Sequence, residues 1–183
     1  MDAPDAQVID DTRRWLERAV IGLNLCPFAK AVHVKGQVHY AVSRAVGWSD
    51  LLADLDREVD ALLAMPAAER DTTLLMVPRA LHDFIEFTGW ISEAERLLQR
   101  RGLEGTLQLA SFHPDYQFAG TQAEDITNFT NRAPYPTLHL LREDRVAQAV
   151  QAFPESADIY ETNMTTMRRL GRQGWDDLMG GAA

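Results

Sequence analysis

A histidine and an aspartate two residues apart, His113 and Asp115, are side chains of the types that carry out acid–base chemistry. They belong to the stretch HPDYQFAG and directly follow the apolar run LQLASF. An imidazole titrates at about pH 6.5, so a histidine held at the end of a strand can exchange protons at neutral pH. We therefore take both as candidate catalytic residues. The structural alternative is that the ring bonds the loop it introduces and that the aspartate closes a turn.

The stretch NFTNRAPYP, a few residues further on, contains groups that could bind a ligand. A guanidinium held among rings and prolines requires an acceptor, either an acid of the chain or the carboxylate or phosphate of a ligand. Asparagine amides could contact the same ligand, although asparagine also closes turns. We expect an anionic or amide-bearing small molecule. The candidate ligand-binding residues are Asn128, Asn131, Arg132, Tyr135 and Tyr116.

A second histidine offers a metal-dependent alternative. His139 lies in the run TLHLL, on the strand face opposite Leu138 and Leu140. Two histidines and a carboxylate are a ligand set suited to a divalent metal such as iron. His113, Asp115 and His139 are therefore the candidate metal ligands, although a lone strand histidine is more often a half-buried structural residue.

The single cysteine, Cys26, is the remaining nucleophile of interest. It follows the expected first helix, and a helix C-terminus does not favour a thiolate. Buried packing is the expected role of Cys26, and a reactive thiol is the alternative. One cysteine excludes an internal disulfide and a cysteine-rich zinc site.

The catalytic and ligand-binding candidates fall within one long segment, residues 113–136, between two expected strands. Loops longer than about 12–15 residues are usually functional or disordered. Aromatic rings and prolines argue against disorder here, because they favour a packed and stiffened loop. Such a loop at the end of a strand is a common place for a binding site.

The hydrophobic pattern elsewhere predicts alternating helices and strands. Apolar spacing predicts a long N-terminal helix over residues 5–24, and VHVKGQVHYAVS is typical of two short strand runs. TTLLMV, GTLQLASF and PTLHLL predict further strands, with helices between them and after them. We expect one α/β or α+β domain, with a mixed sheet of about four or five strands in residues 32–153. The nearest named architecture is a ferredoxin-like sandwich, from which one extra helix departs. A C-terminal helix is expected over residues 156–179, beginning at Ser156 or Asp158.

The composition is that of a globular protein of 183 residues with a net charge of -9. This charge argues against nucleic acid as a partner. No apolar run approaches the about 18 residues of a membrane span, and we expect a cytoplasmic protein without a membrane partner.

Four stretches, GLNLCPFA, HPDYQFAG, NFTNRAPYPTLHLLRE and LGRQGW, resemble the signature of an uncharacterised, mainly bacterial family of unknown function. The resemblance covers nearly the whole chain, but it implies no activity, cofactor or catalytic residue.

Three functions remain open from the sequence. The first is a small-molecule enzyme or ligand-binding protein with a site walled by the loop 113–136. The second is a metal-dependent enzyme that uses His113, Asp115 and His139. The third is a protein-interaction module, or a homo-oligomer, that uses the loop's aromatic rings as anchors.

Overall fold

The fold is built on a four-stranded mixed sheet, seen in a computed structural model that describes residues 3–152 and 158–180. The strands lie in the order β1-β2-β4-β3. β1 and β2 are parallel, whereas β4 is antiparallel to both of its neighbours, β2 and β3. β4 is thus inserted between two strands that run the same way. The strands are β1 (Val38–Val42), β2 (Thr72–Met76), β3 (Leu107–Phe112) and β4 (Thr137–Arg142).

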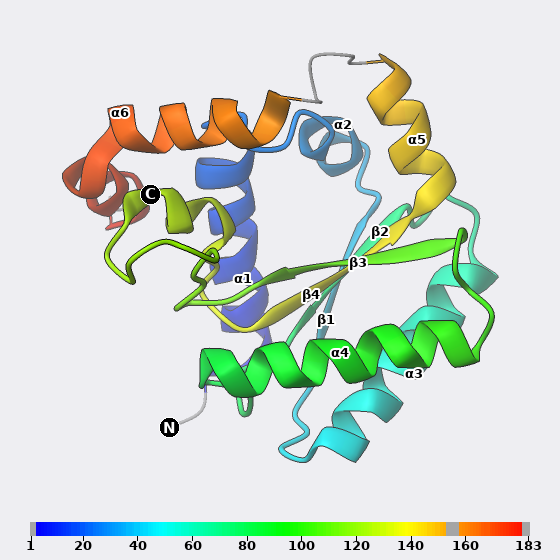
Figure 1. Cartoon of the computed structure of the whole chain (residues 1–183). Helices are drawn as coiled ribbons and strands as arrows, with labels where there is room; N and C mark the ends of the chain where they lie inside the picture. Colours follow the sequence, from blue (N-terminus) through cyan, green and yellow to red (C-terminus); the bar gives the residue numbers. More distant parts are fainter. Residues whose placement is uncertain (1–2, 153–157, 181–183) are drawn as a thin grey trace.

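One face of the sheet is covered by α3 (Trp48–Ala64) and α4 (Phe84–Arg100), which lie side by side (Figure 1). Each helix buries one apolar stripe at the three- and four-residue spacing of an amphipathic helix. These stripes pack on alternate residues of the strands and form the main hydrophobic core. Its largest contributors include Leu51, Leu55, Leu62, Phe87, Trp90, Leu75, Leu138 and Leu140.

The other face is covered less evenly. α1 (Asp5–Trp15) continues into a π-helical turn, η1 (Leu16–Ile21), and α2 (Ala29–Val34) and α5 (Glu143–Ala152) lie nearby (Figure 1). α6 (Ile159–Gly180) packs against η1 and against η2 (Ile126–Asn131), a short 3-10 helix in the long loop. Among the described residues, no helix has the length and apolar character needed to cross a membrane.

The expected mixed sheet is confirmed, and the strand after the long loop is the one that runs antiparallel to its neighbours. One detail was wrong, and one helix boundary differs by a few residues. The first run of VHVKGQVHYAVS is the helix α2, so only Val38–Val42 is a strand. The N-terminal helix turns into η1 after Trp15 and ends before Asn24. α6 begins at Ile159, directly after the expected Asp158, while Ser156 lies outside the described residues.

Candidate functional site

His113 is fully buried and both of its ring nitrogens contact the backbone. Nε2 donates to the Leu81 carbonyl (2.9 Å), and Nδ1 accepts from the Asp115 amide (2.9 Å). The ring packs between Phe84 and Phe87 of α4. Burial lowers the pKa of His113, so the neutral ring is favoured. These contacts match the structural alternative, in which the ring bonds the loop that it introduces. Both ring nitrogens are engaged with the backbone, so neither is available for acid–base chemistry.

The amides and the guanidinium of the loop also bond the protein itself. Buried Asn128 accepts from the Phe118 amide (3.0 Å) and donates to the Gln122 carbonyl (2.8 Å). The Asn131 amide donates to the Ser111 carbonyl (3.4 Å). Arg132 donates to the carbonyls of Tyr116 (3.2 Å) and Ala123 (2.6 Å) and lies 4.2 Å above the Phe129 ring. The structure thus shows these three side chains bracing the loop. 

The two loop tyrosines pack against other elements. The Tyr116 ring contacts Phe84 and Phe118 at centroid distances of 5.2 and 5.0 Å. Tyr135 donates its hydroxyl to Asp11 of α1 (2.9 Å), and burial together with this bond raises its pKa to about 12. A cavity between α4 and the loop has a volume of about 80 Å³. Ligand sites usually measure about 300–1,000 Å³, so this hollow is too small for one.

The expected metal set is not formed, because its two histidines lie on opposite faces of the sheet. His113 packs on α4, whereas His139 points to the face of α1, α2 and α5. Asp115 is exposed on the loop. In the described part of the chain, no group of three or more histidine, cysteine or carboxylate side chains could hold a metal ion.

A larger cavity, of about 530 Å³, lies on the face of the sheet opposite α3 and α4. We call it the sheet cavity. All four strands form its floor, and α1, η1, α2 and α5 contribute its walls. Its lining is mainly apolar, with Trp15, Leu16, Val20, Phe28, Leu74, Ala110, Phe112 and Val146 among the residues that contribute. The volume falls within the range typical of small-molecule sites.

His139 lies at the centre of the cavity floor. The strand register pairs it with Leu74 on one side and with Ala110 on the other. The Thr72 hydroxyl donates to the Leu140 carbonyl (2.6 Å), so at the 2.5 Å contact between Thr72 and His139 the imidazole Nε2 must be the donor. Nδ1 then carries a lone pair and can accept. Burial lowers the pKa of His139 to about 4, and the ring is neutral at pH 7.

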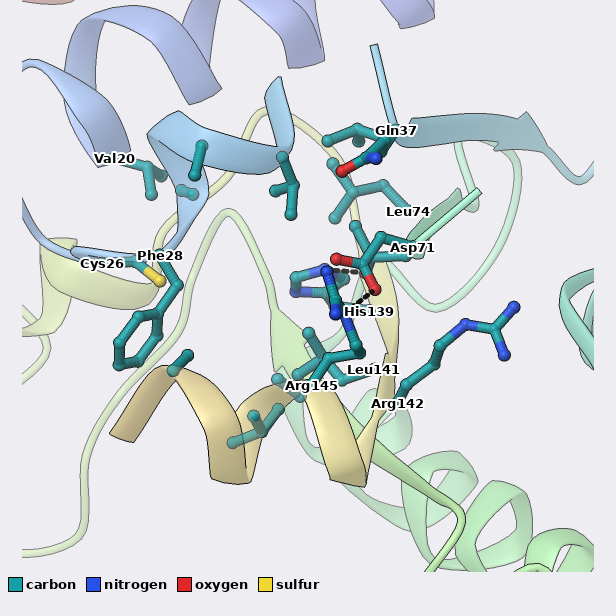
Figure 2. A pocket seen from close by; sticks show the side chains of 18 of the residues that line it. Val20, Cys26, Phe28, Gln37, Asp71, Leu74, His139, Leu141, Arg142 and Arg145 are labelled. Carbon is teal, nitrogen blue, oxygen red and sulfur yellow. Dashed lines mark hydrogen bonds and ion pairs between the residues drawn. The ribbon is translucent and has the colours of Figure 1, made fainter. Parts of the chain in front are cut away.

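Polar side chains gather beside His139, across the cavity from Cys26 and Phe28 (Figure 2). Asp71 is 5% exposed and Gln37 8%. Asp71 Oδ1 lies 3.3 Å from Nε of Arg145 on α5, an ion pair between that helix and the start of β2. Asp71 Oδ1 and Gln37 Oε1 are buried and lack hydrogen-bond partners among the residues described. This side of the sheet cavity, which we call its polar end, therefore has unused hydrogen-bonding groups.

Cys26 lies at the apolar side of the cavity, between η1 and α2. Burial raises the pKa of its thiol, and hydrogen bonds from the amides of Phe28 and Ala29 oppose this shift only in part. Cys26 lies three residues before α2, a helix that the sequence did not predict because its second half was read as a strand. The thiol is protonated at neutral pH, as expected for a packing residue, but it also faces a cavity.

Sequence reasoning found His139 and Cys26 but missed Gln37, Asp71 and Arg145. One signal was available, since Asp71 directly precedes the fully buried strand TTLLM. A carboxylate in that position must be paired or functional. No comparable signal marks Gln37 or Arg145, whose roles depend on how α2 and α5 pack.

Comparison with known proteins gives one match. No curated protein and no solved structure matches the chain. A family model matches residues 7–177, nearly the whole chain. The chain therefore belongs to the family described as protein of unknown function (DUF1415).

Proposed function

We propose that this protein binds a small molecule with an apolar body in the sheet cavity. The observation that carries the proposal is the cavity of about 530 Å³, lined mainly by apolar side chains from four strands and the surrounding helices. Sites for small molecules are typically of this size and lining, with a few polar groups that fix orientation. The polar end of the sheet cavity supplies such groups.

The difference between the two faces of the sheet supports the same proposal. Protein interiors are packed close to the density of organic crystals. The face toward α3 and α4 follows this rule, with a continuous core of buried side chains. The opposite face keeps small residues, Ala110 on β3 and Ala149 on α5, where larger ones would close the space. An unfilled cavity next to buried polar atoms is the arrangement expected of a ligand-binding site.

Cys26 allows a direct test, because it is the chain's single cysteine and lines the cavity. The fluorescent probe N-phenyl-1-naphthylamine is neutral and apolar. We expect it to bind saturably and to slow alkylation of Cys26 by N-ethylmaleimide, followed by mass spectrometry. Saturable probe binding that leaves the alkylation rate unchanged, or no binding at all, would contradict the proposal.

Arg132→Ala distinguishes this site from the loop expected from the sequence. Because Arg132 braces the loop through two carbonyls, we expect the variant to lose about 1–3 kcal/mol of unfolding free energy. Protection of Cys26 by the probe should remain as in the wild type. A folded Arg132→Ala variant that no longer binds the probe would instead indicate that the ligand binds at the loop 113–136.

A further inference from the structure

The polar end of the sheet cavity has a defined hydrogen-bonding character. Gln37 Nε2 donates to the Ala68 carbonyl (3.0 Å), which fixes the orientation of the amide, because a carbonyl can only accept. The unpartnered atom of Gln37 is therefore its oxygen, Oε1. Asp71 Oδ1 is a second acceptor: it forms the ion pair with Arg145 but accepts no hydrogen bond from the described residues. Both side chains are more than nine-tenths buried.

His139 adds a third acceptor. Its Nε2 proton is committed to Thr72, since the Thr72 proton goes to the Leu140 carbonyl. The lone pair on Nδ1 is then available to a donor. Figure 2 shows Gln37, Asp71 and His139 on the same side of the cavity. The guanidinium of Arg142 does not oppose these acceptors, because it points away from the cavity and donates to the carbonyls of Leu62 and Met65 (Figure 2).

The charges around the polar end oppose a cationic ligand. The cations Lys35 and Arg145 line the cavity, whereas Asp71 is the one acidic residue in its lining within the described chain. Asp71 already lies next to Arg145. A further cation would meet a net positive surrounding. A carboxylate would meet the opposite difficulty, because its oxygens would face the lone pairs of Gln37 Oε1 and Asp71 Oδ1 and leave both without a donor.

We infer that the ligand's head is a neutral group with at least two N–H or O–H donors, such as a primary amide or a vicinal diol, attached to an apolar body. This inference rests on the proposed function and specifies its ligand. It selects the amide-bearing alternative over the anionic one. The head would donate to Gln37 Oε1 and Asp71 Oδ1 while the apolar body lies toward Phe28 and Cys26.

Four probes that share one chain length and differ in the head test the inference: octanamide, 1,2-octanediol, octanoic acid and octylamine. Each competes with N-phenyl-1-naphthylamine at neutral pH. We expect octanamide and the diol to displace the probe at concentrations about tenfold lower than octanoate or octylamine do, the factor that an unpaired buried polar group typically costs. Octanoate or octylamine binding as tightly as octanamide would overturn the inference and leave the proposed function standing. Failure of all four to displace a bound probe would also overturn it.

Two variants locate the head. Gln37→Met removes Oε1 with little change in shape and should weaken octanamide about tenfold, while Gln99→Met, an exposed control on α4, should not. Asp71→Asn places a donor where there was an acceptor, so the preference for octanamide over octanoate should fall by about tenfold or more. The Asp71→Asn result stands even if Gln37→Met does not fold. An unchanged preference in folded Asp71→Asn would contradict the assignment.

Discussion

His139 is held in its neutral form by the sheet cavity, and this has a consequence for stability. Its pKa of about 4 in the folded protein lies below the value of about 6.5 in an unfolded chain. The unfolded state therefore binds the proton more tightly. The stabilisation is fully present above about pH 6.5 and is lost progressively as the pH falls toward about 4.

His139→Gln should remove this dependence, because glutamine stays neutral and can still donate to Thr72. We expect the wild type to lose about 2 kcal/mol more unfolding free energy than His139→Gln between about pH 7.5 and pH 5. Urea denaturation at the two pH values measures the difference. His82→Gln, a change at an exposed histidine, serves as the control and should follow the wild type. Equal pH sensitivity of His139→Gln and the wild type would show that the ring is not held neutral.

α5 is a wall of the sheet cavity with little packing behind it. Every residue of this helix is at least partly exposed, so local opening should cost little free energy. It continues directly from β4, and Arg145 ties it to Asp71 on the neighbouring strand segment. The ion pair therefore holds the helix over the cavity.

Arg145→Ala should loosen α5 without unfolding the protein. We expect faster amide hydrogen exchange along α5 and faster alkylation of Cys26, with a loss of about 1 kcal/mol in unfolding free energy because Arg145 is partly exposed. Arg96→Ala breaks an exposed ion pair with Glu93 on α4 and is the matched control. If both variants exchange alike along α5, the Asp71 pair does not hold the helix.

Elements with a long apolar period were predictable, and short ones were not. α3 and α4 each bury a stripe over 17 residues, which the spacing of leucines and aromatics indicates directly. α2 has six residues, and in so short a run the alternation of Val32, His33 and Val34 fits a strand equally well. The loop's partners were hidden for another reason. Arg132 and His113 bond backbone carbonyls, which carry no sequence signature.

At the scale of the whole molecule, one face of the sheet is filled by a continuous core, whereas the other is packed only in part and also encloses the sheet cavity. The sequence predicts the alternation on β4 that sends Leu138 and Leu140 to one side and His139 to the other. It does not predict that the second side encloses a cavity, because the lining extends from Trp15 to Ala149 and depends on how the helices pack. The candidate site could therefore be recognised only from the assembled fold.

The same substitution on the two faces should have opposite effects. Ala110 lies on the cavity floor beside His139, whereas Ala41 is buried in the core under α3 and α4. Ala110→Leu adds apolar atoms to available space and should raise the unfolding free energy by about 1 kcal/mol. Ala41→Leu overfills a packed core and should lower it by about 1–3 kcal/mol. Thermal and urea denaturation of the two variants measure both changes.

Probe binding gives the second measurement on the same pair. Ala110→Leu should abolish binding of N-phenyl-1-naphthylamine and its protection of Cys26, because the added side chain occupies the centre of the sheet cavity. Ala41→Leu, if folded, should bind the probe as the wild type does, since its side chain faces away from that space. Destabilisation by Ala110→Leu equal to that of Ala41→Leu would mean that both faces are packed alike. Unchanged probe binding in Ala110→Leu would place the probe outside the sheet cavity.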